Sequence, residues 1–406
     1  MSSTPSVSEI VGELARDLLN PGSSSRRSGR SSLSLSEILE ASGDEDRGPV
    51  DMFERASRPL LPRRVPGYSK DMVHVGVDTS TRLLATPYAD ILVSALSVSG
   101  PGPVELCDYP SLYGEPMSCG PSPPPFIYVV PHGAVELPEQ EGVASVMASP
   151  SDLSQSFISK LADYARLSLE RWAMEVPVEQ IARAFAEAGR RPVVMLDGPI
   201  FISQGKGVGN LMVQRYEAVK QLESAGVPVI GVVKRVERSF ILSSSPSYSR
   251  LLEGCGLSAP GETDSMILQR LTSLGCVDEV PGRVYVTPKI IVKGGDGIEK
   301  IVEYVIMMPS AWQKLGVRSK VFRLEYTEET LNMLEEFNVD PLQAFLGDSL
   351  ARESLEPVSV SMSDRRAKAL TSSLRALLAK EVVGLGGRLG YESEVELRGL
   401  AGEGEE

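Results

Sequence analysis

Two aspartates that follow apolar, strand-like runs are the residues best suited to chemistry. Asp78 closes the run "VHVGVD" and Asp197 closes "VVMLD". Residues at the carboxyl ends of core strands lie at the sheet edge where open α/β proteins build their sites. A buried carboxylate is costly unless its charge is compensated, and a bound cation does so. The pattern therefore predicts that Asp78 and Asp197 meet to bind divalent metal; the alternative is that each is a turn residue or a helix cap.

The third ligand is expected from the predicted helix between these strands. At about 100° per residue, Glu175 projects onto the apolar stripe of this helix, roughly 40° from Leu161. A carboxylate on a core-facing stripe needs a partner, so Glu175 is the preferred ligand and Glu179, one turn later, the reserve. Glu170 projects about 180° from Leu161 and is predicted to be a solvated charge. Pro177 can kink the helix here, so the alternative is that Glu175 is a surface charge at a helix end.

The ligand types indicate which metal the site would take. Oxygen ligands without a His/Cys cluster favour Mn²⁺ or Mg²⁺ over zinc, and a paired-ion site would hold two ions about 4 Å apart. The chain has two histidines and four cysteines without a CxxC pair. A structural zinc site is not expected, and the cysteines are predicted to be free thiols in a reducing cytoplasm. They are Cys107, Cys119, Cys255 and Cys276.

A basic group completes the candidate site. Lys234 ends the apolar run "VIGVVK" and can reach into a cleft as a point charge for phosphate. Arg235 and Arg238 follow within the same stretch. The alternative is an ordinary strand end that meets water, because lysines are mostly exposed.

The elements that must position these groups indicate an α/β fold. Runs rich in β-branched residues predict strands at residues 72–78, 89–98, 126–130, 192–196, 227–236, 284–287, 289–294 and 320–326. Apolar spacings of three and four predict helices at residues 152–188, 208–225, 265–274, 328–337 and 363–383. The strand–helix–strand order at residues 192–236 predicts two parallel strands with a right-handed crossover. The Pro- and Gly-rich residues 99–125 predict a long excursion made of turns.

Composition divides the chain into three parts. Residues 1–70 hold a predicted helix, "VSEIVGELARDLL", and a Ser/Arg/Gly-rich tract that buries too little apolar surface to order itself. Folded structure is expected to start near Met72, and the main domain spans residues 71–385. Residues 386–406 form an acidic tail that is expected to fray.

Overall composition narrows the class of protein. The chain has 406 residues, a hydrophobic fraction of 42% and a formal net charge of −13. This charge argues against a protein that coats nucleic acid by bulk attraction, but it allows a DNA enzyme with a local basic groove. The sequence contains no apolar run of about 18 residues, so a membrane span is not expected. The N-terminus lacks a charged region followed by an apolar one, so a secretory signal is not expected.

Five motifs in order resemble the NurA nuclease family: "VGVDTSTR", "RWAMEV", "VVMLDGPI", "GVPVIGVVKRV" and "VFRLEY". The resemblance covers residues 73–326 and extends more loosely to residue 382. It implies a ribonuclease-H-like core, a mixed sheet flanked by helices, and Mn²⁺-dependent cleavage of DNA. The expected activities are those of a 5′-to-3′ exonuclease and a single-strand endonuclease. The resemblance also implies a homodimer that works beside the hexameric HerA ATPase in the resection of DNA ends, during double-strand-break repair.

The resemblance assigns roles to four residues by motif. Asp78 and Asp197 resemble the first and the later metal aspartate of the family. Glu175 best fits the helix glutamate, because "AME" lies at a family-like distance before "LDG". Lys234 resembles the strand-end lysine. In such a site the ions would activate a water and stabilise the leaving 3′ oxygen, and the lysine would neutralise phosphate charge.

One position departs from the family pattern. The family tends to carry a histidine near its C-terminal helices, whereas the histidines here are His74 and His132. Asp348 lies roughly where that histidine would fall, and it is open whether it replaces the histidine. The departure puts metal affinity or proton transfer in question.

The sequence also bears on the DNA substrate and on two alternative functions. A recessed site favours single-stranded or frayed DNA, on which Tyr216 or Phe240 could stack bases unless they belong to the core. "VGVDTST" also faintly resembles the phosphate loop of actin-like ATPases and sugar kinases, whose pattern needs glycine at the position of Thr79. A third reading is a catalytically decayed scaffold that docks a partner ATPase through its N-terminal segment.

Overall fold

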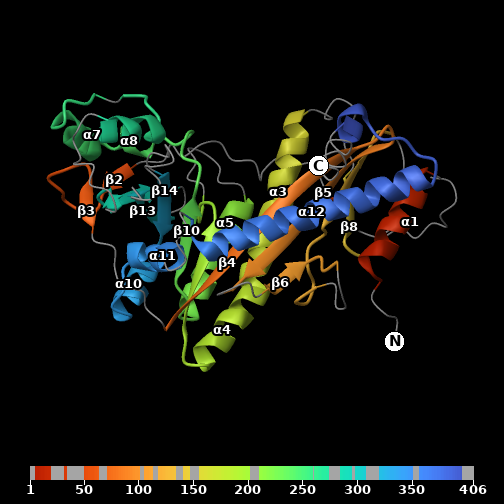
Figure 1. Ribbon diagram of the computed structural model, residues 1–406, viewed down its shortest axis with the longest axis horizontal. Coiled ribbons are helices and arrows are strands. Elements are labelled where there is room, and N and C mark those ends of the chain that lie inside the picture. Colours follow the sequence, from red (N-terminus) through yellow and green to blue (C-terminus); the bar gives the residue numbers. More distant parts are fainter. Residues whose placement is uncertain are drawn as a thin grey trace, which may run out of the picture.

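One large mixed sheet organises the computed structural model (Figure 1). The structure describes residues 5–19, 32–33, 50–63, 71–100, 105–112, 118–133, 140–146, 155–201, 210–258, 260–273, 284–294, 298–307, 320–350 and 356–395. The strands are β1 (Ser32–Leu33), β2 (Val50–Met52), β3 (Leu61–Arg63), β4 (Met72–Ala85), β5 (Ala89–Ser99), β6 (Glu105–Tyr109), β7 (Ile127–Pro131), β8 (Val143–Val146), β9 (Arg191–Asp197), β10 (Val229–Val233), β11 (Val284–Val286), β12 (Ile290–Lys293), β13 (Glu299–Met307) and β14 (Lys320–Tyr326). The helices are α1 (Val7–Leu19), α3 (Gln155–Ala173), α4 (Glu179–Glu187), α5 (Asn210–Ser224), α6 (Ile241–Ser244), α7 (Pro246–Glu253), α8 (Asp264–Ser273), α10 (Glu328–Glu336), α11 (Pro341–Leu350) and α12 (Val358–Gly384).

The centre of the sheet has the strand order of a ribonuclease-H-like fold. β5 pairs antiparallel with β4, and β6 and β7 pair antiparallel with different ends of β5. β9 is parallel to β4, and β10 is parallel to β9, as the strand–helix–strand pattern predicted. The expected fold class, a ribonuclease-H-like mixed sheet flanked by helices, is confirmed. Beyond β10 the sheet continues through β14, β13, β11 and β3.

The register between β4 and β9 places the two aspartates side by side. Val77 lies opposite Leu196, so Asp78 and Asp197 follow on neighbouring strands and point to the same face. β9 ends at Asp197 as predicted, whereas β4 continues to Ala85 with β5 as its partner. The prediction that Asp78 ends its strand is therefore wrong. Asp78 lies instead where the parallel neighbour of its strand ends.

Helices α3 and α12 lie on opposite faces of β4. α12 passes so close to Gly76 that an added Cβ would lie 2.2 Å from the carbonyl oxygen of Ser359. Figure 1 shows this helix running across β4 and β5. On the other face, Thr79 donates a hydrogen bond to Glu170 of α3. Because side chains alternate along a strand, Asp78 faces α12.

The long helix predicted at residues 152–188 is interrupted in its middle. A π-helical turn, Met174–Val178, joins α3 to α4 and contains Pro177. Proline cannot donate to the α-helical hydrogen-bond ladder, and the π-turn accommodates this without ending the helix. The turn shifts the helical phase, so a projection from Leu161 does not hold around Glu175.

Parts of residues 1–70 belong to the folded core. α1, a predicted helix, packs its buried apolar side chains in the same cluster as those of α12. β2 pairs with β12, and β3 pairs with β11. Folded structure thus begins before Met72. Apart from β1, the Ser/Arg/Gly-rich tract at residues 20–49 lies outside the described residues, as do residues 396–406 of the tail. Among the described helices, none combines the length and apolar character that a membrane crossing requires.

The excursion at residues 99–125 contains a strand and a disulfide that the sequence did not indicate. Cys107 on β6 is bonded to Cys119, with their Cα atoms 5.9 Å apart. The prediction of free thiols is wrong for this pair, because β6 pairs with β5 and Cys119 lies beside β6, with its Sγ 3.8 Å from the carbonyl oxygen of Asp108. Among the described residues Cys255 forms no disulfide, and Cys276 lies outside them.

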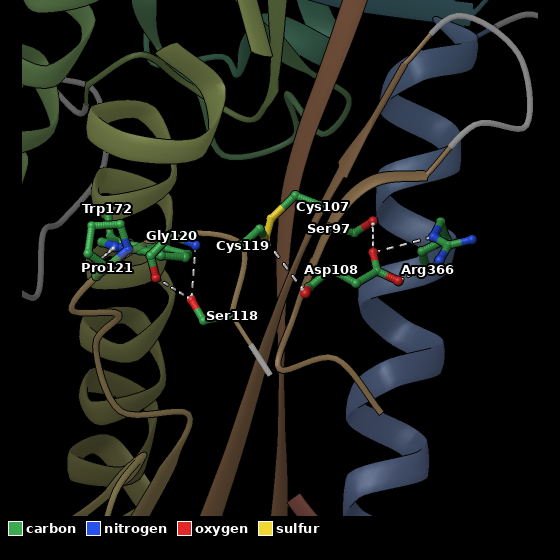
Figure 2. Close-up of a disulfide and its surroundings, with 9 residues drawn as sticks. All are labelled: Ser97, Cys107, Asp108, Ser118, Cys119, Gly120, Pro121, Trp172 and Arg366. Carbon is green, nitrogen blue, oxygen red and sulfur yellow. Dashed lines mark hydrogen bonds and ion pairs between the residues drawn. A yellow bond between two sulfur atoms is a disulfide. The ribbon is translucent and has the colours of Figure 1, made fainter. Parts of the chain in front are cut away.

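The disulfide lies between α3 and α12 (Figure 2). On one side, Pro121 accepts a hydrogen bond of 3.0 Å from the indole of Trp172 on α3. On the other side, Asp108 accepts one of 2.5 Å from Arg366 on α12. Residues next to the two cysteines, Asp108 and Pro121, therefore contact both helices that flank β4.

Replacing Cys107 and Cys119 together with serine is expected to lower the free energy of unfolding by about 2–3 kcal/mol. The bond closes a loop with a sequence separation of 12, and opening it returns entropy to the unfolded chain. Guanidinium unfolding with and without a reductant measures the effect. Reductant should weaken the wild type and leave the variant unchanged; equal stability of the variant and the oxidised wild type would contradict the prediction.

Candidate metal centre

Three aspartates from distant parts of the chain converge on the α12 face of the sheet. Carboxylate oxygens of Asp78, Asp197 and Asp364 all lie within 4.8 Å of one another. Asp78 comes from β4, Asp197 from the end of β9 and Asp364 from the first half of α12. Asp78 is buried and the other two are half-buried. The strand aspartates thus meet, with a third partner from a helix that the sequence did not indicate.

Burial and mutual repulsion govern the ionisation of these carboxyls. Burial raises the pKa of Asp78 well above its usual range, and the charge of Asp197 raises it further. Burial also raises the pKa of Asp197, against the lowering effect of Lys234. For Asp364 burial is outweighed by Lys368 and Lys234, which bring its pKa below the usual range. Three carboxyls this close disfavour one another's charge unless a cation joins them.

Lys234 contacts the cluster from the residue after β10. Its Nζ lies 2.7 Å from Asp197 Oδ2 and 3.7 Å from Glu356 Oε2. The lysine side chain is 18% exposed, so its ammonium group borders both the cluster and solvent. Arg235 and Arg238, the other basic residues of this stretch, are exposed.

The opposite face of β4 carries a buried ion pair. Glu170 of α3 accepts a hydrogen bond of 2.7 Å from Thr79 Oγ1 and pairs with Arg215 of α5. Glu170 and Arg215 are each 2% exposed, so the prediction that Glu170 is a solvated charge is wrong. Thr79 of β4 and Arg215 of α5 both contact the side of α3 that projects away from Leu161, and α3 therefore buries two of its faces. The charge of Glu170 raises the pKa of Asp78, which places it within electrostatic reach of the cluster.

Glu175, the preferred ligand, lies in the π-helical turn and pairs within its own helix. Its Oε1 accepts a hydrogen bond of 2.8 Å from Arg171 Nε. Glu179, the reserve, pairs with Arg183 at 2.5 Å. Among the described residues, the acidic group that gathers around Asp78 contains neither glutamate. The role of Glu175 as a ligand stays a prediction that would require it to leave Arg171.

Asp348 anchors the start of α12 and does not join the cluster. Its Oδ2 accepts hydrogen bonds from the Ser359 backbone nitrogen at 2.9 Å and from Ser359 Oγ at 2.5 Å. His74 Nδ1 lies 4.0 Å from its other oxygen. The C-terminal acidic residue that reaches the two strand aspartates is Asp364, further along the same helix.

Sequence reasoning missed Asp364 because its surroundings are typical of a solvated helix. It lies in "SDRRAKAL", a stretch of mixed charge. The signal that could have found it is the small residue Gly76, two positions before Asp78. Only without a Cβ can β4 accept the backbone of Ser359 so closely, and this approach brings the next turns of α12 over Asp78.

The two aromatic residues considered for base stacking, Tyr216 and Phe240, are each half-buried. Tyr216 packs edge-on against Phe201, with ring centroids 5.3 Å apart. Phe240 is half-buried at the start of α6. Tyr216 therefore contributes to packing in this conformation.

The fold and the acidic cluster together define a ribonuclease-H-like α/β protein with a candidate cation site at its centre. A family model described as NurA domain matches residues 137–369. This is more than half of the 406 residues, and the chain belongs to the NurA family. The match contains Asp197, Lys234 and Asp364, whereas Asp78 precedes it.

Two further comparisons complete the picture. The chain is similar to the crystal structure of the NurA nuclease from Sulfolobus solfataricus, with a TM-score of 0.41 and 9% sequence identity. The similarity covers 78% of this chain and 85% of that chain. No curated protein matches the sequence.

Proposed function

We propose that this protein is a metal-dependent nuclease that hydrolyses phosphodiester bonds of DNA. The observation that carries the proposal is the convergence of Asp78, Asp197 and Asp364 within 4.8 Å. Membership of the NurA family supports it. The donors fit a hard divalent cation, because all are carboxylate oxygens and no histidine or cysteine is among them. A cation would also relieve the burial and repulsion that raise the pKa of Asp78.

Each residue of the site has one role in this proposal. Asp78, Asp197 and Asp364 hold the metal, which when bound would lower the pKa of a water and stabilise the leaving oxygen. The sheet fixes the two strand aspartates, and α12 adds the third. Lys234, now paired with Asp197, binds a non-bridging oxygen of the scissile phosphate.

Two glutamates compete for the helix position. Glu175 is the ligand expected from the resemblance, but it is paired with Arg171. Glu170 already acts on the pKa of Asp78 and is held in place by Thr79 and Arg215. We place Glu170 first as the helix carboxylate that supports the site.

The finer features of the proposal follow the family resemblance. They are Mn²⁺ as the preferred ion, a pair of ions, 5′-to-3′ exonuclease and single-strand endonuclease activity, and a role in DNA end resection and repair. A homodimer, a HerA-type hexameric ATPase as partner and a cytoplasmic location belong to the same proposal. Asp78 is only 7% exposed, which favours a single strand or a frayed end over an intact duplex.

The purified full-length chain, stripped of metal with EDTA, is expected to leave single-stranded DNA intact and to cut it when Mn²⁺ is added without nucleotide. The actin-like or sugar-kinase class predicts instead transfer of the γ-phosphate of ATP and no cutting. A decayed scaffold predicts neither reaction. Absence of cutting with Mn²⁺ and with Mg²⁺, on single-stranded and on frayed DNA, would refute the proposed function.

A further inference from the structure

A buried ion pair lies beneath the segment that follows Asp197. Glu325 of β14 and Lys300 of β13 are 0% and 1% exposed. Glu325 Oε2 accepts a hydrogen bond of 2.9 Å from Lys300 Nζ and one of 3.1 Å from the backbone nitrogen of Ile200. Lys300 Nζ also donates to the carbonyl oxygen of Phe201 at 2.7 Å. The pair therefore contacts the backbone three and four residues after Asp197.

The segment at residues 198–201 is also held against β10. Gly198 donates its backbone N–H to the carbonyl oxygen of Val232 at 3.0 Å. A Cβ at Gly231 would lie 2.7 Å from Gly198 O and 3.0 Å from Ile200 N, so the segment passes directly over this glycine. Gly231 faces Glu325 across the β10–β14 pairing, which lets the carboxylate reach past it to Ile200. The backbone directly after Asp197 is therefore held both by β10 and by the Lys300–Glu325 pair.

Stability alone does not account for these buried charges. Taking two charges out of water is costly, and well-packed apolar residues of similar volume often stabilise a core as well or better. Oε1 of Glu325 pairs with Arg323 at 2.8 Å, which adds a second cation to the same buried group. The hydrogen bonds to Ile200 and Phe201 give the group a geometric task that apolar side chains cannot perform.

We propose that Lys300 and Glu325 are positioning residues that fix the backbone after Asp197 and so aim its carboxylate at Asp78. The inference rests on the proposed metal centre. Groups that orient a metal ligand without touching the metal typically change metal affinity by about 10- to 100-fold when they are removed. Lys300 and Glu325 would act one step further out, through the backbone three and four residues after Asp197.

Calorimetric titration of the metal-stripped full chain with Mn²⁺ tests the inference. Lys300→Met/Glu325→Leu removes both charges and both backbone contacts, and it is expected to weaken Mn²⁺ binding about 10-fold or more. Glu325→Gln keeps an acceptor for Ile200 and is expected to bind within about twofold of the wild type. Tyr326→Phe is the matched control, because it loses a buried hydrogen bond of 3.1 Å on the neighbouring residue without touching the segment.

The outcomes separate this inference from the metal centre itself. Mn²⁺ binding by the double variant within twofold of the wild type overturns the positioning role. Equal weakening in Tyr326→Phe also overturns it, because loss of stability would then explain the effect. If the double variant does not fold, Lys300→Met alone, which loses the contact to Phe201 and keeps Glu325 for Ile200 and Arg323, decides by the same criterion. If Asp78→Asn binds Mn²⁺ like the wild type, the metal centre is refuted. If Asp78→Asn loses Mn²⁺ binding while the double variant keeps it, only the positioning role is refuted.

Discussion

Asp78→Asn is expected to abolish metal-dependent DNA cutting and, at neutral pH, to raise the stability of the metal-free protein. The first effect follows from the loss of a ligand that no neighbour can replace, and a fall on the order of 10³-fold or more is the scale for residues that act as a unit. The second follows from the cost of ionising a buried carboxyl beside Asp197. DNA cleavage with Mn²⁺ and thermal unfolding in EDTA measure the two effects on one sample.

The raised pKa values explain why Asp78→Asn should stabilise the metal-free protein at neutral pH. The pKa of Asp78 and that of Asp197 are raised in the folded state, so the folded protein binds more protons than the unfolded chain. Their contribution to stability is present below the unfolded value of about 3.9 and is lost as pH rises through the raised folded pKa. Asp364, whose pKa is lowered, acts in the opposite sense and loses its contribution as pH falls. Asp78→Asn should therefore flatten the decline of melting temperature with rising pH.

Bound metal should reverse the sign of the pH dependence at the cluster. Protons compete with the cation for Asp78 and Asp197, so metal affinity is expected to fall as pH falls. Ser80→Ala, on the same strand and face two residues after Asp78, is the matched control and should keep cutting. Asp78→Asn or Asp197→Asn variants that still cut DNA with Mn²⁺ would disprove the site.

Local pattern was sufficient to predict the two strand aspartates. Asp78 and Asp197 each follow a run of apolar residues, and parallel strands in register bring such positions together. Lys234 could be predicted for the same reason, because β10 is the next parallel strand and ends one residue before it. These predictions needed only strand periodicity and the strand–helix–strand order.

The residues that sequence reasoning misplaced depend on contacts between distant elements. Glu170 projects away from the apolar stripe of α3, and it is buried because that side contacts Thr79 of β4 and Arg215 of α5. Asp364 has no apolar context, and its place is set by the crossing of α12 over Gly76. Cys107 and Cys119 are joined because β6 pairs with β5, a pairing that a turn-rich composition conceals. In each case the deciding interaction lies outside the local sequence window.

Glu170→Gln is expected to destabilise the protein by about 3–5 kcal/mol, whereas Glu175→Gln should cost only about 0.3–0.5 kcal/mol. Glu170 and Arg215 are buried, and two nitrogens of Arg215, Nε and Nη2, have no hydrogen-bond partner among the described residues. Without Glu170 the buried guanidinium loses its ion-pair partner. Glu175 and Arg171 are 27% and 37% exposed, so water replaces their contact at little cost. Urea unfolding of the two variants measures the difference.

Glu175→Gln and a double variant that removes the Glu170–Arg215 pair decide which glutamate serves the metal centre. Burial lowers the pKa of Arg215 against the opposing effect of Glu170, so the cation is tolerated mainly because this carboxylate faces it. Arg215→Met/Glu170→Leu removes both charges and should regain much of the lost stability, because the pair repays its own desolvation poorly. If Glu170 is the supporting carboxylate, this double variant folds but binds Mn²⁺ weakly, while Glu175→Gln cuts DNA like the wild type. A Glu175→Gln variant that folds and does not cut would instead make Glu175 the ligand, released from Arg171 when metal binds.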